Sequence, residues 1–515
     1  MRVFSLVVLA AALALLAGCS SSGGGPTPVG VATIVSLSPS AGQSLGPGGT
    51  LTITATVTSG SSNTGVTWSL SGPGTLSSKT ANPVTYTAPS SASSNINVVV
   101  TATAAASSSA TAYLPLIIVP SVTGSNVVPL AVNSGPAQNS SNIAFVSITI
   151  CEPGTTTCQT VDDIQVDTGS AGLRVLQSAI PSLSLSSLTD TSGNTINNCV
   201  SFLDGSYLWG PVQQADLRIN GEVAGGALIQ TISSGSPTIP SACSNGGTVL
   251  ENTPTLLGAN GILGVGLEPT DCIVAGQDFC DGSVSSTIPA IYFSCPSSGC
   301  ASNASPVVET ATNQVVNPIV LFATDNNGSA IQFAPVSGAA ATATGSLTFG
   351  IGTQSNNALG SATVFTLDSS DNFETIFQGQ SLIASFIDSG SNSLSFPSTL
   401  TVCPGNNSSF YCPTGLTSLS AENVAFDLTT GAFDGTPNTV PFDIDNASTL
   451  FATNGGNDFA FSTLGGPQGT YNTCTSTGSG SCSFDWGLPF FYGRTVFTAI
   501  DGQAVSVATA PWFAY

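Results

Sequence analysis

The chain contains Val166-Asp167-Thr168-Gly169-Ser170-Ala171-Gly172-Leu173 and, 221 residues later, Ile387-Asp388-Ser389-Gly390-Ser391-Asn392-Ser393-Leu394. Each stretch is an apolar residue, an Asp-[Thr/Ser]-Gly-Ser turn and a Leu six residues after the acid. The tripeptide Asp-[Thr/Ser]-Gly occurs nowhere else in the chain. The repeat predicts two related lobes that meet at their acids. Two carboxyls in close contact cannot both ionise easily, so one keeps a proton and acts as acid while the other acts as base. The candidate catalytic residues are therefore Asp167 and Asp388.

The composition excludes several other kinds of chemistry. The 515 residues include 5 Lys and Arg against 27 Asp and Glu, which gives a net charge of −22, and there is no histidine. Such a charge repels nucleic acid, so we expect no nucleic-acid partner. Without histidine, Ser-His-Asp catalysis, Cys-His catalysis and histidine-ligated metal sites are excluded. Carboxylate chemistry remains, and we expect no metal and no cofactor.

The N-terminus predicts export. Residues 1–18 have a positive start at Arg2 and an apolar run that is short for a bilayer span. Leu16-Ala17-Gly18-Cys19 resembles the lipobox of bacterial lipoproteins, which implies lipidation of Cys19; an ordinary signal peptide before a free cysteine is the alternative. Residues 19–32 are rich in Ser, Gly and Pro and predict a flexible tether. We expect a cell-envelope lipoprotein, at the outer membrane or cell surface rather than the inner membrane, because Ser20 and not Asp follows the cysteine.

The cysteines fit an exported protein. Of 13 Cys, 12 follow residue 150, and an even number suits an oxidising compartment. Connectivity does not follow from sequence, but pairing between neighbours would pin surface loops. That pairing is Cys151/Cys158, Cys199/Cys243, Cys272/Cys280, Cys295/Cys300, Cys403/Cys412 and Cys474/Cys482.

Residues 33–119 predict a separate all-β module. Residues 51–58 alternate strictly, 97–103 alternate in part, and 66–70 and 84–87 are further short strands between Gly and Pro clusters. This pattern is typical of a β-sandwich. Parts of it resemble bacterial immunoglobulin-like repeats, in which Trp68 would be a core residue. We expect the module to act as a stalk or spacer.

From residue 124 onward the chain keeps its β character. Strand-like runs such as 143–150 and 317–322 recur between Gly/Ser loops, and long periodic helical segments are nearly absent. The region is too long for one sandwich. We expect two β-lobes, over residues 124–338 and 339–515.

This region resembles the pepsin-like aspartic peptidases. The two Asp-[Thr/Ser]-Gly-Ser motifs match the active-site motifs of that family. Residues 260–266, Asn-Gly-Ile-Leu-Gly-Val-Gly, are similar to the apolar strand that crosses under the first active-site loop. Residues 486–491 and 495–497 occupy the corresponding place in the second half, and residues 331–333 and 345–349 resemble the crossing between lobes. The resemblance implies an all-β, two-lobed β-barrel domain after the immunoglobulin-like sandwich.

The resemblance also implies roles for the residues around the acids. The two glycines let the backbone turn tightly, Thr168 and Ser389 hydrogen-bond across to the opposite loop, and the two following serines donate to the carboxylates. A water between the acids would attack a peptide carbonyl, and the dyad titrates as a unit. The supporting residues are Thr168, Gly169, Ser170, Ser389, Gly390 and Ser391.

A flap is the most divergent feature. The family carries a tyrosine on a hairpin over the site, and the best match here is residues 201–207. The flap candidates are Phe202, Asp204, Gly205 and Tyr207, with Phe202 at the tyrosine position. Arg174 stands where many members have a tryptophan that supports the tyrosine; otherwise it reads as a solvated surface arginine.

Three functions fit these observations. The first is a membrane-anchored, exported aspartic endopeptidase that acts on extended polypeptides, as a monomer. The second is a non-catalytic surface binding protein on a pepsin-like scaffold, since a fold alone does not give a function. The third is another dicarboxylate hydrolase, such as a glycosidase, which would not require two matched turns. Retention of both motifs favours the first.

Overall fold

The computed structural model describes residues 33–38, 43–45, 48–59, 62–90, 96–118, 126–202, 205–244, 249–284, 287–468, 483–505 and 508–515. The chain divides into two compact units, Met1–Ser121 and Val122–Tyr515. The expected signal and tether lie outside the described residues. Within them the fold is mostly β, as predicted, and no described helix is long and apolar enough to cross a membrane. The α-helices have four residues each: α1 (Ser241–Ser244), α2 (Pro254–Leu257) and α3 (Ala447–Leu450).

The first unit is a sandwich of two four-stranded sheets. Strand β3 alternates between buried and exposed side chains, and the buried rows of both sheets form one apolar cluster. Trp68 is 3% exposed within that cluster, and its indole N–H donates to the Ala81 carbonyl at 2.9 Å. The predicted sandwich and its core tryptophan are confirmed. In spatial order, one sheet consists of β1 (Ile34–Ser38), β3 (Thr50–Thr58), β6 (Val84–Thr87) and β5 (Thr75–Leu76). The other consists of β2 (Gln43–Leu45), β8 (Ser107–Ile118), β7 (Ile96–Ala104) and β4 (Val66–Ser71).

The first half of the second unit contains a closed barrel, which we call the first lobe. A 16-stranded sheet contains it, and the ring closes where β10 pairs with β15. Such closure leaves no strand edge in the ring exposed. The barrel strands are β10 (Ala144–Cys151), β11 (Cys158–Asp167), β12 (Ala171–Leu176), β15 (Ser206–Ile219), β16 (Glu222–Ile232) and β18 (Gly261–Val265). Shorter strands flank it: β13 (Ser186–Ser187), β14 (Thr195–Ser201), β17 (Val249–Leu250), β19 (Ile273–Val274), β20 (Gln277–Asp278) and β21 (Tyr292–Cys295).

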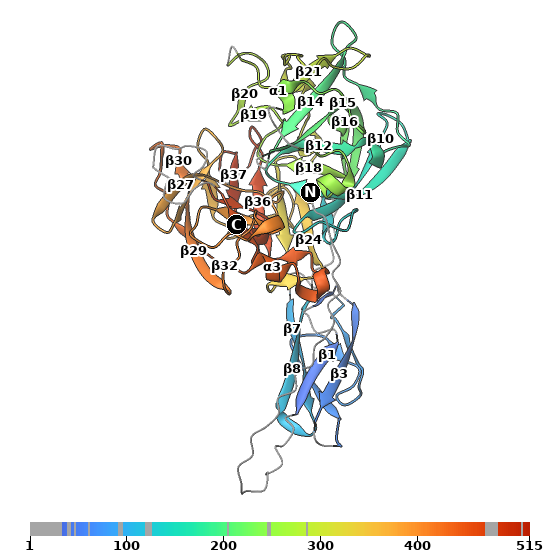
Figure 1. Ribbon diagram of the computed structural model, residues 1–515, viewed down its shortest axis with the longest axis vertical. Coiled ribbons are helices and arrows are strands. Elements are labelled where there is room, and N and C mark those ends of the chain that lie inside the picture. The colour runs from blue at the N-terminus through green and yellow to red at the C-terminus, as the bar shows by residue number, and fades with distance from the viewer. Residues whose placement is uncertain are drawn as a thin grey trace. The chain divides into compact units, whose positions relative to one another are not determined.

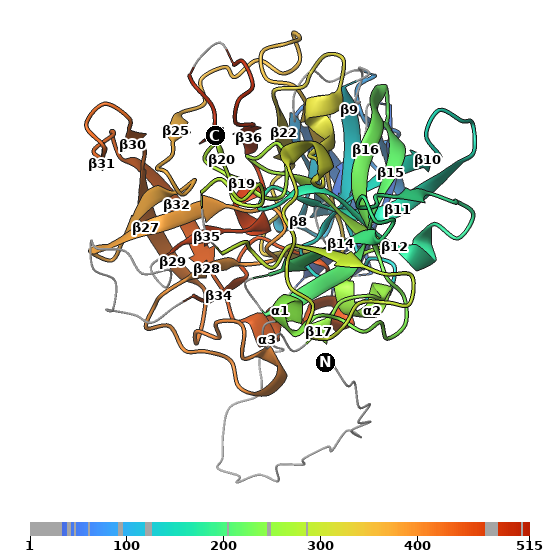
Figure 2. The same ribbon diagram turned by 90° about the horizontal axis from the view of Figure 1, so that it is seen from above.

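The same sheet continues into six further strands, which we call the central sheet. Of these strands, β36 is seen between the first lobe and the orange strands of the second lobe in both views (Figures 1 and 2). β22 and β24, which contain the residues predicted to cross between the lobes, pair antiparallel in this sheet. In spatial order the strands are β9 (Val127–Val132), β24 (Ala343–Phe349), β22 (Gly328–Phe333), β36 (Thr495–Ala499), β37 (Trp512–Ala514) and β25 (Val364–Thr366).

A seven-stranded sheet forms the second lobe. Its core is aromatic: Phe396 stacks on Phe484 at 4.8 Å between ring centroids, and Phe484 stacks on Trp486 at 3.9 Å. In spatial order the strands are β32 (Asn438–Ile444), β29 (Thr417–Val424), β26 (Phe373–Phe377), β27 (Gln380–Ile387), β35 (Asp485–Trp486), β28 (Leu394–Phe396) and β34 (Gly465–Pro467). Two small pairs accompany it, β23 (Ala339–Ala340) with β33 (Ala460–Phe461) and β30 (Phe426–Asp427) with β31 (Ala432–Phe433).

Two strand predictions were wrong. Residues 317–322 contain a 3₁₀ helix, Pro318–Leu321, because Pro318 occupies its first turn and the Asn317 side chain accepts a hydrogen bond from the Ile319 amide. Residues 486–491 are strand only at their start. A 3₁₀ helix, Leu488–Phe491, follows with Pro489 in its first turn.

Five disulfides join neighbouring cysteines, as predicted: Cys151–Cys158, Cys199–Cys243, Cys272–Cys280, Cys295–Cys300 and Cys403–Cys412. The sixth predicted pair, Cys474 and Cys482, lies outside the described residues. Disulfides persist in oxidising compartments. The bonds therefore indicate an extracytoplasmic protein.

Arg174 is buried, which contradicts the prediction of a solvated surface arginine. The residue is 1% exposed on β12, and its guanidinium lies 3.0 Å from the Asp271 carboxylate. Asp271 also accepts hydrogen bonds from Asn198, at 2.8 Å, and from the Tyr292 hydroxyl. Burial raises the pKa of Asp271, and Arg174 opposes that rise. β14 and β21 carry Asn198 and Tyr292, so this ionic network ties the barrel to the hairpin strand β14.

Replacing Arg174 with Met should lower the free energy of unfolding by about 3–5 kcal/mol, because the variant leaves the buried Asp271 without its ion partner. Arg218→Met is the matched control, since Arg218 is exposed on β15, and it should change stability by less than about 0.5 kcal/mol. Denaturant unfolding of both variants measures the difference. Equal stabilities would show that the ion pair contributes nothing.

Candidate active site

The first acid sits where three strands of the first lobe meet. Asp167 is the last residue of β11, and β18 inserts between β11, to which it is parallel, and β12, to which it is antiparallel. A Cβ at Gly264 would lie 2.7 Å from the Ser170 and Ala171 carbonyl carbons. Only glycine permits this approach, so the motif residues 260–266 hold the Asp167 turn from beneath.

The second acid has the same surroundings. Asp388 follows β27, and β35 inserts between β27, to which it is parallel, and β28, to which it is antiparallel. A Cβ at Gly487 would lie 2.7 Å from the Ser391 carbonyl oxygen. The repeat in the sequence is thus a repeat in three dimensions.

The two acids face each other across the lobes. A Cβ added to Gly169 would lie 2.7 Å from Cγ of Asp388, and one added to Gly390 would lie 2.5 Å from Oδ1 of Asp167. Each acid therefore occupies the space that the glycine of the opposite turn leaves free, and a side chain at either glycine would push the pair apart.

Reciprocal hydrogen bonds lock the two turns together. The Thr168 amide donates to the Ser389 hydroxyl at 3.1 Å, and the Ser389 amide donates to the Thr168 hydroxyl at 2.9 Å. Each hydroxyl in turn donates to a carbonyl of the other lobe, Thr168 to Ile387 at 3.2 Å and Ser389 to Val166 at 2.8 Å. All four groups are buried, so each would be costly to leave unpaired. The cross-lobe bonds implied by the resemblance are present.

Each carboxylate is also held by its own turn. The Gly169 amide donates to Asp167 at 2.8 Å and the Gly390 amide donates to Asp388 at 2.7 Å. The hydroxyls of Ser170 and Ser391 donate to the second oxygens. These four donors fix both carboxyl planes.

The electrostatics of the pair are asymmetric. Burial, and then the neighbouring charge of Asp167, raise the pKa of Asp388 well above its usual value. Asp388 is partly accessible to solvent, although its carboxyl is surrounded by protein atoms. Loss of the proton that the pair shares is therefore disfavoured, and the Asp388 residue stays partly exposed to solvent.

Two residues of the first lobe hydrogen-bond to the Asp388 turn, and the sequence patterns did not identify them. The Gln165 side chain donates to the Gly390 carbonyl at 2.8 Å, and the Asn142 side chain donates to the Asn392 carbonyl at 2.9 Å. Asn142 is fully buried and also bonds Phe461 and the Tyr492 hydroxyl. Neither belongs to a motif, and no local signal in the sequence identifies them.

The predicted flap is a hairpin of β14 and β15. The Phe202 amide donates to the Ser206 carbonyl at 2.9 Å, and Gly205 turns the chain with φ +85°. The Phe202 side chain is half-buried against the apolar cluster of Leu176 and Leu208, and Tyr207 packs against the cluster around Trp209. Asp204 lies outside the described residues. That the hairpin covers the acids stays a prediction.

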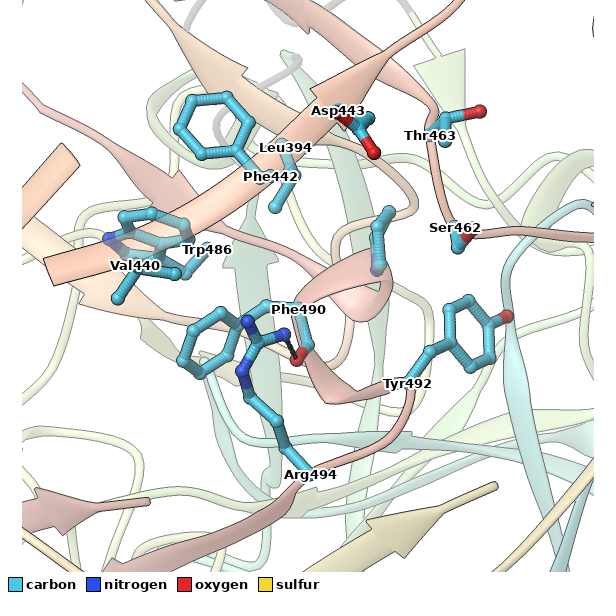
Figure 3. Close-up of a pocket in the computed structure, with 11 residues that line it drawn as sticks. Leu394, Val440, Phe442, Asp443, Ser462, Thr463, Trp486, Phe490, Tyr492 and Arg494 are labelled. Atoms are coloured by element: carbon cyan, nitrogen blue, oxygen red, sulfur yellow. Dashed lines mark hydrogen bonds between the residues drawn. The ribbon is translucent and has the colours of Figure 1, made fainter. Parts of the chain in front are cut away.

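A separate cavity of about 170 Å³ lies in the second lobe (Figure 3). Neither acid lines it. Arg494 forms part of its wall, stacked 4.6 Å from the centre of the Phe490 ring and bonded to the Phe490 carbonyl at 2.8 Å. Among the described residues there is no group of three or more side chains that could hold a metal ion.

Comparison with known proteins places the chain in a family but supplies no activity. No curated protein matches it. A family whose description is "Protein of unknown function (DUF3443)" matches residues 122–515, which is the whole of the second compact unit. Because this match covers most of the chain, the protein belongs to the DUF3443 family.

Proposed function

We propose that this protein is an exported aspartic endopeptidase of the pepsin-like type. The observation that carries the proposal is the pair of facing carboxyls, Asp167 and Asp388, each of which lies against the glycine of the opposite turn where two equivalent turns meet. A pair of carboxyls that holds one proton can act as base and acid in the same step. Its substrates would be extended polypeptides, bound through their backbone groups.

The roles of the two acids follow from their protonation. Asp388 holds the shared proton, because burial raises its pKa. A water between the acids gives a proton to Asp167 as its oxygen attacks the peptide carbonyl carbon, and Asp388 donates its proton to the developing oxyanion. The tetrahedral intermediate then expels the amine, which takes up the proton from Asp167, while one hydroxyl of the intermediate returns its proton to Asp388 as the new carboxyl group forms. The serine and glycine donors keep both carboxyls oriented throughout.

Two other functions remain to be weighed against this one. A glycosidase needs its carboxyls about 5 Å or more apart to leave room for the sugar and water, whereas each of these two is packed against the opposite turn, 2.5–2.7 Å from where a Cβ on that turn's glycine would lie. That argues against the glycosidase. A non-catalytic binding protein on the same scaffold is favoured by the divergent hairpin, which has Phe202 at the position of the tyrosine.

Asp167→Asn and Asp388→Asn should each reduce cleavage of an unfolded protein to background, because either change removes the shared-proton state. Asp434→Asn is the matched control, since Asp434 is exposed in the second lobe, and it should cleave like the wild type. Circular dichroism checks that all three are folded, and a statine-type inhibitor should block the wild type. Activity retained in both dyad variants would rule out the aspartic mechanism. A folded wild type that cleaves nothing would leave the binding protein as the better proposal.

The pH dependence follows from the same proton. Activity requires that Asp388 keep its proton, so it should be present in acid and fall as the pH rises through the raised pKa of that group. We expect an optimum below about pH 6, within the range of known carboxyl dyads. Cleavage rate and folded fraction, measured on one sample from about pH 3 to 8, test this. An optimum at neutral pH or above in a folded protein would contradict the prediction.

We also propose that a lipid on Cys19 tethers the protein to the cell envelope. The disulfides support an extracytoplasmic location, and the lipobox-like Leu16-Ala17-Gly18-Cys19 supports the anchor. Mass spectrometry of the mature N-terminus should find diacylglycerol on Cys19, and Cys19→Ser should leave the protein unprocessed or released. A mature chain that starts elsewhere without lipid would refute the anchor and leave the peptidase proposal intact.

A further inference from the structure

A glutamine near the end of β11 bonds across the lobes to the second turn. Gln165 lies two residues before Asp167, is 9% exposed, and donates from its side-chain amide to the Gly390 carbonyl at 2.8 Å. The equivalent position of the second lobe, two residues before Asp388, holds Phe386, whose side chain cannot donate a hydrogen bond. At this position the first lobe therefore binds the second turn, and the second lobe has no matching donor.

The bound carbonyl adjoins a serine that donates to the dyad. The carbonyl of Gly390 and the amide of Ser391 belong to one planar peptide unit, so Gln165 fixes the plane from which the Ser391 side chain begins. The Ser391 hydroxyl donates to Oδ2 of Asp388 at 2.9 Å. A hydrogen bond donated to a carboxyl favours its charged form. The placement of Ser391 therefore affects both the orientation of the Asp388 carboxyl and its affinity for a proton.

Other contacts hold the turn without Gln165. The Ser391 carbonyl accepts a hydrogen bond from the Leu488 amide at 2.8 Å, and the Asn392 carbonyl accepts one from the Asn142 side chain at 2.9 Å. The reciprocal bonds between the two turns are also independent of Gln165. Loss of the glutamine amide should thus shift the Ser391 peptide unit and leave the turn folded.

We propose that Gln165 is a positioning residue of the site: through its bond to the Gly390 carbonyl it holds Ser391 where the hydroxyl donates to Asp388. This inference rests on the proposed peptidase function. It means that a contact between the lobes sets the hydrogen bonding of one member of the dyad.

The proposal predicts the direction of a pH shift. Burial, and then the charge of Asp167, raise the pKa of Asp388, and the charge of Asp485 in β35 adds to that rise. A change at Gln165 alters neither of these acids. It weakens the hydrogen bond that Ser391 donates, so the pKa of Asp388 should rise further.

The first test is the pH profile of kcat and KM for Gln165→Met, which keeps the length of the side chain without its donor. Gln165→Asn keeps the amide and shortens its reach, and replaces the first variant if that one does not fold. Gln214→Met is the matched control, because Gln214 is exposed on β15 and also donates to a backbone carbonyl.

We expect kcat of both Gln165 variants to fall by about tenfold, the size of one hydrogen bond, with KM unchanged and the alkaline limb moved to higher pH. The control should keep the wild-type values. A limb that does not move would indicate a merely structural role and overturn the inference. A raised KM with unchanged kcat would place Gln165 against the substrate and overturn it as well.

A double-mutant cycle tests the route through the serine. Ser391→Ala should by itself move the alkaline limb to higher pH, because it removes a donor to Asp388. In that background Gln165→Met should add no further shift, since the hydroxyl through which it acts is gone. Shifts that simply add would show that Gln165 does not act through Ser391.

The last test does not depend on activity. The folded-state pKa of Asp388 lies above its unfolded value, so the stability that this group contributes is present in acid and is lost as the pH rises through the raised pKa. Gln165→Met raises that pKa further. The difference in unfolding midpoint between variant and wild type should therefore widen from about pH 4, near the unfolded value, to about pH 10, and it should stay constant for Gln214→Met.

This measurement separates the inference from the function on which it rests. A constant difference for Gln165→Met would overturn the role of Gln165. A wild type that cleaves nothing, with a difference that widens, would count against the peptidase alone. A wild type that cleaves, with a constant difference and an unmoved limb, would count against the role of Gln165 alone.

Discussion

The reciprocal hydrogen bonds between Thr168 and Ser389 are the constraint on which the rest of the site depends. Asp167 and Asp388 repel each other when both are charged, so the lobes must be fastened at the point where the acids meet. The fastening is made of four buried bonds between backbone and side-chain groups, each of which crosses from one lobe to the other. The acids themselves need contribute no attraction. The lobes can therefore be held together at the candidate site without a positively charged side chain there.

The glycines and inserted strands follow from that fastening. Each turn must come close enough for its glycine to lie against the opposite carboxyl, and each must be supported from below by a strand that approaches without a side chain at Gly264 or Gly487. The central sheet, with strands from the beginning, middle and end of the second unit, holds the two halves in one framework. The path of the chain through the central sheet and the geometry of the site therefore both serve to hold the two turns close together.

The two lobes stabilise a buried ionisable side chain in different ways. In the first lobe the strand position beside Ile262 carries Arg174, which is neutralised by Asp271 in an ion pair. In the second lobe the corresponding position carries Ser395, and the inserted strand carries Asp485 instead. With no cation beside it, burial raises the pKa of Asp485 to about 8, which favours the neutral form of the carboxyl. The symmetric framework thus holds an asymmetric distribution of charge, and only the second half adds an acid next to the dyad.

The sequence by itself determined the β class, the sandwich and the two turns, because each depends on a local pattern: alternation or an Asp-[Thr/Ser]-Gly tripeptide. It suggested that neighbouring cysteines pair, and the structure decided this for the five described disulfides. It failed where a local pattern was ambiguous, as at Pro318 and Pro489, where proline favoured a 3₁₀ turn over a strand. Only the tertiary structure decided that Arg174 is buried, that Asn142 and Gln165 hold a turn more than two hundred residues away, and that Asp485 lies beside the dyad. These contacts join segments whose separation along the chain carries no periodic signal, so the packing of the two lobes, and not any short motif, selects the residues that make them.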